Sequence, residues 1–163
     1  PAQAAVHAVT TANEMLDKVK ALVAQADIFI GVAAVSDYRP VKASTEKIKK
    51  SDETLRLDLV RNPDILASVA ALKDAPFTVG FAAETEATRA NAKAKLKDKG
   101  LDLIVANTIT SEDNPFGSDR NRLLIIDADS ELDLGSGKKT LLAERLVIEI
   151  ARHYRAKHPT TDT

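Results

Sequence analysis

Two hydrophobic patterns alternate along the chain. Largely apolar runs at Ile28 to Val35, Phe77 to Ala83 and Leu101 to Ala106 predict strands buried between helices. A shorter run from Leu123 to Ile126 predicts a further strand. Between residues 55 and 60 leucines alternate with charged residues, which predicts a half-exposed strand compatible with antiparallel pairing. The polar, charged stretch 36–53 predicts a long loop.

Between these runs, apolar residues recur at helical spacing. Thr11 and Glu14 have the spacing of a capping box ahead of a first amphipathic helix, which carries apolar residues as far as Val23. The segment Asn62-Pro63-Asp64 supplies an N-cap, a first-position proline and a first-turn acid. It therefore predicts that a second helix begins at Asn62, with apolar positions continuing to Leu72.

The carboxyl-terminal part repeats this arrangement. A third helix is predicted from Thr85 to Lys99, closed by Gly100. A turn around Gly135 and Gly137 should lead into a final helix ending near Tyr154. We expect one domain over residues 1–156, incomplete at its amino end because the chain begins at Pro1, and a flexible tail over 157–163.

Strands separated by helices predict the fold class. The alternation favours an α/β, Rossmann-like three-layer fold with a mainly parallel sheet and helices on both faces. In open sheets of this kind, ligands bind outside the carboxyl ends of the strands. The residues that follow Val35, Ala83 and Ala106 are therefore the places to look for chemistry.

Composition narrows the possible functions. The 163 residues carry a formal net charge of -1, which gives no global basic field for nucleic acid. Cysteine is absent, which excludes disulfides, thiolate ligands and a cysteine nucleophile. The longest apolar run is far shorter than the roughly 20 residues needed to span a bilayer, so we expect a cytoplasmic protein without membrane contact.

Small residues at the end of the first strand could admit a flat ligand. Gly31, Val32 and Ala33 would let it approach the backbone, and Asp37 just beyond could accept hydrogen bonds from a ribose. The same residues are equally compatible with tight packing beside a solvated turn aspartate. Asn62-Pro63-Asp64 could place free helical N–H groups at an anion, but Asp64 opposes an anion and favours simple capping.

Two groups of lysines could bind phosphate. Lys47, Lys49 and Lys50 fall in the long loop, where a cationic flap could close over a triphosphate. Lys95 and Lys99 are four residues apart and share one helix face. Solvated surface charge explains either group without a ligand. The histidines have no spacing typical of a metal site, and no GxGxxG or Walker A motif is present.

Five segments, taken together in order and spacing, resemble one family. They are Gly31-Val-Ala-Ala-Val-Ser-Asp-Tyr-Arg39, Lys47-Ile-Lys-Lys50, Asn62-Pro-Asp-Ile65, Val79-Gly-Phe-Ala-Ala-Glu-Thr85 and Asp102-Leu-Ile-Val-Ala-Asn107. The family is bacterial phosphopantothenoylcysteine synthetase, and the resemblance extends from about Val9 to Tyr154. It implies a CTP-dependent ligase of coenzyme A biosynthesis, which joins 4'-phosphopantothenate to L-cysteine through an acyl-cytidylate, with Mg2+ accompanying CTP.

The resemblance also implies roles for particular residues. Lys47 is the expected catalytic residue, in a flap over the reacting phosphates, and Asp37 is expected near the ribose. The implied nucleotide-binding set is Gly31, Val32, Ala33, Asp37, Lys47, Pro63, Asp64, Ile65, Leu66, Phe81, Lys95 and Lys99. The metal ligands are not identified.

Features of the family that lie outside this sequence set further expectations. Relatives carry a glycine-rich first strand and an Asn-x-Ser-x-Gly-x-Met-Gly segment, and nothing here matches them. We therefore expect nucleotide-site elements without full turnover unless an upstream piece is supplied. Many relatives also carry an upstream flavin-dependent decarboxylase domain, whereas this chain should need no flavin. The resemblance further implies a homodimer.

Two other classes of function stay open from the sequence alone. The architecture would suit a nicotinamide-dependent reductase, although the phosphate-binding glycines of that class are missing. A noncatalytic nucleotide-binding module is the second alternative. The choice of CTP over ATP depends on the resemblance and not on a physical argument.

Overall fold

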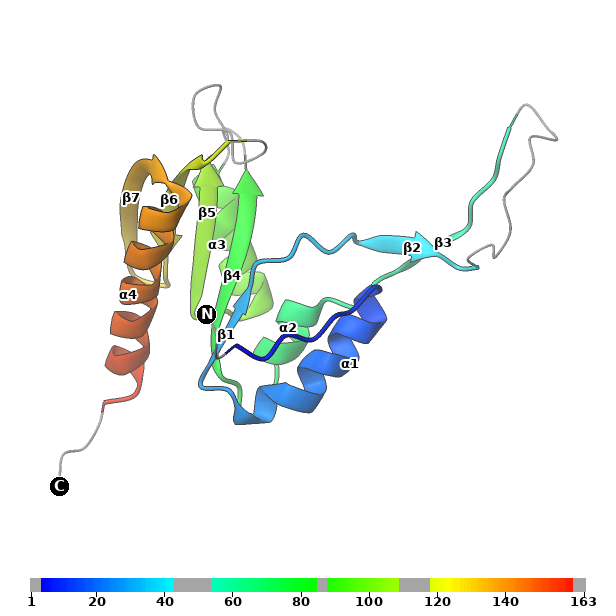
Figure 1. The fold of residues 1–163 in the computed structure, drawn as a ribbon, viewed down its shortest axis with the longest axis horizontal. Helices are drawn as coiled ribbons and strands as arrows, with labels where there is room; N and C mark the ends of the chain where they lie inside the picture. Colours follow the sequence, from blue (N-terminus) through cyan, green and yellow to red (C-terminus); the bar gives the residue numbers. More distant parts are fainter. Residues whose placement is uncertain (1–3, 43–53, 85–87, 109–117, 160–163) are drawn as a thin grey trace.

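A computed structural model describes residues 4–42, 54–84, 88–108 and 118–159 of the chain (Figure 1). The elements are α1 (Ala12–Leu22), a 3-10 turn η1 (Val23–Gln25), β1 (Ile28–Gly31), β2 (Tyr38–Pro40), β3 (Leu59–Arg61), α2 (Ile65–Ala70), β4 (Phe77–Glu84), α3 (Thr88–Lys99), β5 (Leu103–Thr108), β6 (Arg120–Ile126), β7 (Glu131–Lys138) and α4 (Lys139–Lys157). The capping box predicted ahead of α1 is confirmed, since the Thr11 side chain accepts from the Glu14 amide while the Glu14 side chain accepts from the Thr11 amide.

The central sheet has five strands in the order β1-β4-β5-β6-β7. β1, β4 and β5 are parallel, whereas β6 pairs antiparallel with β5 and β7 antiparallel with β6. The α/β, Rossmann-like class is confirmed, but the parallel arrangement is limited to one half of the sheet. β6 and β7 are joined by the short segment 127–130, and such a hairpin connection requires antiparallel neighbours.

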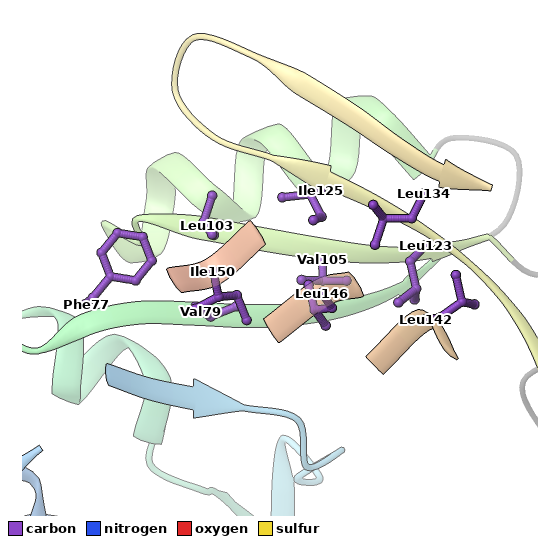
Figure 2. Packing of buried hydrophobic residues seen from close by; sticks show 10 residues of the cluster. All are labelled: Phe77, Val79, Leu103, Val105, Leu123, Ile125, Leu134, Leu142, Leu146 and Ile150. Atoms are coloured by element: carbon purple, nitrogen blue, oxygen red, sulfur yellow. The ribbon is translucent and has the colours of Figure 1, made fainter. Parts of the chain in front are cut away.

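Helices cover both faces of the sheet, as predicted. On one face α4 packs against the sheet through ten buried residues, three of them its own, that we call the α4 cluster (Figure 2): Phe77, Val79, Leu103, Val105, Leu123, Ile125, Leu134, Leu142, Leu146 and Ile150. On the other face α3 supplies Ala92 and Leu96, which pack against Ala82, Ile104 and Ile126. The resulting three layers bury residues 103–106 of β5, with Leu103 and Val105 both 0% exposed.

Two predicted boundaries are wrong for physical reasons. β1 ends at Gly31 instead of Val35, because its register with β4 stops where Gly31 faces Gly80. The turn predicted around Gly135 and Gly137 is the interior of β7. Gly135 has a positive φ of 72° beside a register shift between Leu123 and Leu124. Gly135 therefore forms a β-bulge, which needs the same backbone freedom as a turn.

A two-stranded ribbon was missed by the sequence prediction. β2 lies within the predicted loop and pairs antiparallel with β3, which confirms antiparallel pairing but shortens the predicted strand 55–60. We call residues 38–42 and 54–61 the arm; Figure 1 shows that it projects away from the central sheet. Lys47, Lys49 and Lys50 lie outside the described residues.

The carboxyl-terminal helix is longer than predicted. α4 continues past Tyr154 to Lys157, which was predicted to begin the tail. The Lys157 ammonium donates to the Asp102 carboxylate at 2.5 Å, and the other Asp102 oxygen accepts from the Thr78 amide at 2.8 Å. These contacts fasten the end of α4 to the start of β5. Within the described parts of the chain, no helix is long and apolar enough to cross a membrane.

The turn between β6 and β7 is organised by Asp127. Its carboxylate accepts from the Ser130 hydroxyl and the Asp129 amide, each at 2.8 Å, and lies 3.1 Å from His153 Nε2 on α4. Partial burial alone would raise the pKa of Asp127, but these hydrogen bonds outweigh it and hold the pKa below its ordinary value. The turn therefore favours the ionised carboxylate.

We predict that Asp127 contributes to the acid sensitivity of the fold. A carboxyl group with a lowered folded-state pKa stabilises the protein above its unfolded pKa of about 3.9, and this stability is lost as pH falls through the folded pKa. In urea titrations between pH 7 and pH 3, Asp127→Asn should lose less stability on acidification than the wild type. Asp129→Asn, at an exposed neighbour, should keep the wild-type slope. Equal slopes for wild type and Asp127→Asn would contradict the prediction.

Candidate functional site

A cavity of about 570 Å³ lies at the end of β1 that the sequence predicted to bind a ligand. β1 and the segment after it form one side, and residues 61–66 form the facing side. Met15 of α1, Phe81 of β4 and Lys99 of α3 complete the lining. The cavity therefore gathers segments that are far apart in the sequence.

Two adjacent glycines bring α2 close to the sheet. Gly31 of β1 and Gly80 of β4 are partners in the parallel register. A Cβ at Gly80 would lie 2.8 Å from a methyl carbon of Leu66, and a Cβ at Gly31 would lie 3.3 Å from another. Real Cβ atoms do not approach carbon at 2.8 Å, so Leu66 occupies space left by the missing side chains. Because Leu66 also lines the cavity, this close packing sets the position of the cavity wall.

A hydrogen-bonded clip joins the two facing sides. Arg39 Nη1 donates to Asn62 Oδ1 at 3.0 Å and to the carbonyl of Arg61 at 2.8 Å. Asn62 in turn donates from Nδ2 to the Ser36 carbonyl and from its amide to the Asp37 carbonyl, both at 2.8 Å. These contacts hold the segment after β1 against the segment before α2, at the root of the arm.

Asp64, and not Asn62, caps α2. Asp64 Oδ1 accepts from the Ala67 amide at 3.0 Å, so the helix begins at Ile65 and the predicted cap is two residues too early. The reason is tertiary, since the Asn62 side chain is engaged in the clip. The segment caps the helix as predicted, but it does so through Asp64 and not through Asn62.

An ion pair spans the cavity wall. Lys99 Nζ lies 2.9 Å from Asp64 Oδ2, and their side chains are 33% and 48% exposed. Partial burial would raise the pKa of Asp64, but the Ala67 amide and the Lys99 ammonium outweigh burial. They hold the pKa below its ordinary value and keep the carboxyl ionised. The cavity thus contains a fixed carboxylate and a cation held beside it.

Most of the residues predicted to bind nucleotide are brought together. Those that line the cavity are Gly31, Val32, Ala33, Asp37, Pro63, Asp64, Ile65, Leu66, Phe81 and Lys99. Lys95, one helical turn before Lys99, does not contribute to the lining. Lys47 lies outside the described residues, so its predicted catalytic role stays a prediction.

The sequence prediction missed several lining residues: Met15, Phe29, Ile30, Val35, Ser36, Arg61 and Asn62. All of these except Met15 lie within two positions of Gly31, Asp37 or Pro63, so proximity along the chain could have suggested them. Arg61 matters most chemically, because it adds a second cation to the lining. Met15 had no local signal, since it comes from a helix that reaches the cavity only through the fold.

Sequence comparison identifies the family of this chain. The sequence profile of the DNA/pantothenate metabolism flavoprotein C-terminal domain matches residues 1–154. The chain belongs to this family. The family relationship inferred from the five segments is thereby confirmed.

Similar curated proteins are longer than this chain. The coenzyme A biosynthesis bifunctional protein CoaBC of Escherichia coli K12 is 45% identical over 154 residues, covering 92% of this chain and 38% of that protein. The CoaBC protein of Vibrio vulnificus CMCP6 is 41% identical over 145 residues, covering 87% and 36%. The chain therefore spans less than two fifths of the length of these relatives.

Solved structures share the fold. The C-terminal domain of a CoaBC protein superposes with a TM-score of 0.69 at 29% identity, covering 88% of this chain and 65% of that one. A Streptococcus pneumoniae structure named DNA/pantothenate metabolism flavoprotein gives 0.73 at 22% identity, covering 91% and 73%. A Cab2 variant in complex with phosphopantothenate-cysteine gives 0.67 at 20% identity, covering 93% and 54%. The last two support the fold alone.

Proposed function

We propose that this chain is the nucleotide-binding part of a phosphopantothenate-cysteine ligase that uses CTP in coenzyme A biosynthesis. The observation that carries the proposal is the convergence of family segments on one cavity, where Gly31, Asp37, Asp64 and Phe81 all contribute to the lining. The printed names of the similar curated proteins place them in coenzyme A biosynthesis. An upstream flavin-dependent decarboxylase domain in the full protein is part of the proposal.

The proposed reaction has two steps. A carboxylate oxygen of 4'-phosphopantothenate attacks the α-phosphorus of CTP, which forms an acyl-cytidylate and releases pyrophosphate. The amine of L-cysteine then attacks the acyl carbon and CMP leaves. Both steps depend on neutralising and positioning phosphoryl charge, which suits a site built from cations and backbone groups.

The cavity residues have distinct roles in this proposal. Lys99 and Arg61 face the triphosphate, Asp37 accepts hydrogen bonds from the ribose, and Phe81 with Pro63 borders the base. Lys47 is proposed to act over the reacting phosphates. Lys95 is assigned a weaker, longer-range attraction to the triphosphate because it does not line the cavity.

Mg2+ is proposed to enter with CTP. Magnesium keeps several water ligands and usually binds through substrate phosphates together with one or two carboxylates. Asp37 and Asp64 are the acidic residues of the cavity lining, and the Asp64 carboxylate is paired with Lys99, so the site fits a metal held chiefly by the nucleotide. Across the described ranges, no group of three or more potential ligands forms a separate metal site. No flavin is assigned to this chain, and a cytoplasmic location stays a prediction.

Calorimetric titration with CTP and Mg2+ tests the nucleotide site directly. The wild-type chain should bind CTP saturably, and Lys99→Ala should weaken binding about tenfold or more because a charge-assisted contact to phosphate is lost. Lys97→Ala is the matched control, since Lys97 is exposed on the same helix and does not line the cavity. Lys95→Ala should fall between the two. A folded wild-type chain that binds no nucleotide would overturn the proposed site.

A homodimer is the proposed assembly, and the arm supports it. Leu55, Leu57 and Leu59 are 65%, 58% and 54% exposed, and large exposed apolar patches mark interaction sites. Light scattering at micromolar concentration should give twice the mass of the 17.5 kDa chain. Leu57→Asp should shift the mass towards the monomer. A monomeric wild type at that concentration would contradict the assembly without affecting the nucleotide proposal.

A further inference from the structure

We propose that the Asp64 carboxylate is a positioning residue that holds Lys99 for the nucleotide phosphates and does not itself contact the nucleotide. The inference rests on the proposed function, because it assigns a partner to a cation of that same site. Asp64 and Lys99 both line the cavity and lie 2.9 Å apart. The following contacts distinguish positioning from ligand binding.

Both oxygens of the Asp64 carboxylate are already used. Oδ1 accepts from the Ala67 amide at 3.0 Å, and Oδ2 accepts from Lys99 Nζ at 2.9 Å. The carbonyl of Asp64 accepts from Ser68 Oγ at 2.6 Å and from the Ser68 amide at 2.9 Å. The carboxylate is therefore fixed to α2, and a ligand that took either oxygen would have to replace one of these bonds.

A fixed carboxylate beside Lys99 restricts the conformations of the lysine side chain. Lys99 is the last residue of α3, and a lysine side chain has many rotamers that binding must restrict. The ion pair with Asp64 restricts it before the nucleotide arrives. An ammonium has three N–H donors, so one bond to Asp64 leaves two that can reach phosphate oxygens. Organising the cation in advance lowers the entropy lost on binding.

Electrostatic repulsion alone predicts that the Asp64 carboxylate weakens CTP binding. A carboxylate beside a triphosphate site repels the ligand, so removing its charge should strengthen CTP binding if the carboxylate has no positioning role. If Asp64 acts through Lys99, removing the charge should weaken CTP binding. The sign of the change therefore decides between the two.

Asp64→Asn is a suitable variant because asparagine is as good an N-cap as aspartate. The cap to Ala67 is kept while the charge facing Lys99 is lost. We expect Asp64→Asn to weaken binding of CTP with Mg2+ by about tenfold, measured by calorimetry on the full chain. Asp98→Asn removes a carboxylate next to Lys99 in the sequence that does not line the cavity, and it should leave the Kd unchanged.

A double-mutant cycle tests whether Asp64 acts through Lys99. Lys99→Met removes the ammonium and keeps most of the aliphatic stem. In that background only the repulsion between the carboxylate and the triphosphate is left, so Asp64→Asn should leave the Kd for CTP unchanged or lower it. An equal loss with and without Lys99 would overturn the proposal, as would tighter CTP binding by Asp64→Asn alone.

Cytidine separates positioning from general damage to the cavity. Cytidine lacks phosphate, so its binding, measured by ligand-observed NMR, should be the same in wild type and Asp64→Asn. Weakened binding of both ligands would indicate that the cavity itself is disturbed, and would overturn the specific role given to Lys99. A folded wild type that binds neither ligand would instead reject the proposed function on which the inference rests.

Discussion

Gly80→Ala should destabilise the protein and weaken CTP binding together. The new Cβ would lie 2.8 Å from methyl carbons of both Leu66 and Leu101, so both side chains must move away from β4, and Leu66 would move with or within α2. Overpacking of this kind costs about 1 to 3 kcal/mol of unfolding free energy. Because Leu66 lines the cavity, its displacement should also raise the Kd for CTP. Urea unfolding and calorimetric titration measure the two effects.

Gly137→Ala provides the matched control for this substitution. Gly137 is also inside a strand and has no positive φ, but its Cβ would make an ordinary contact at 3.6 Å from Leu142. Both variants gain the same advantage of alanine over glycine in a strand. The difference between them therefore isolates the close approach of α2. Equal stability and equal CTP affinity in both variants would contradict the argument.

Leu146→Ala should cause a large loss of stability without changing the nucleotide site. Leu146 is 7% exposed within the α4 cluster, and truncating a buried leucine to alanine costs about 2 to 5 kcal/mol. Leu141→Ala on the same helix is the control, because Leu141 is 55% exposed and its loss should cost about 0.5 kcal/mol or less. Urea unfolding compares the two.

CTP affinity completes the test of Leu146→Ala. Leu146 does not line the cavity, so the folded variant should bind CTP as the wild type does at a temperature well below its unfolding transition. A raised Kd in the fully folded variant would show that the α4 cluster supports the site. A stability equal to that of Leu141→Ala would show that Leu146 is not part of the core in solution.

Features set by local sequence were predicted well. The apolar runs predicted β4 and β5, because a strand buried on both faces cannot carry many polar residues. Gly31 and Asp37 were predicted to be near each other because ligand-binding residues follow the carboxyl ends of parallel strands. The capping box of α1 was predicted because it depends only on residues within one turn.

Features set by distant contacts were not predicted. The clip joins Arg39 and Asn62, which are 23 residues apart, and no periodic pattern signals such a pair. Because the clip occupies Asn62, the cap of α2 moved to Asp64. At Gly135 the sequence indicated backbone freedom correctly, but it could not distinguish a bulge within β7 from a turn between elements.

The residues that line the cavity and those that form the α4 cluster come mostly from different elements around the mixed sheet. The described residues that line the cavity come from α1, α2 and α3, from β1 and β4, and from the arm and the segments that flank it. The α4 cluster is built from β4, β5, β6, β7 and α4. Phe81 of β4 lines the cavity and also packs against that cluster, so the two regions meet there. Substitutions in the β6–β7 hairpin and α4 can therefore accumulate and change the free energy of unfolding while the choice of ligand stays the same. Phe81 is the position where both properties change together.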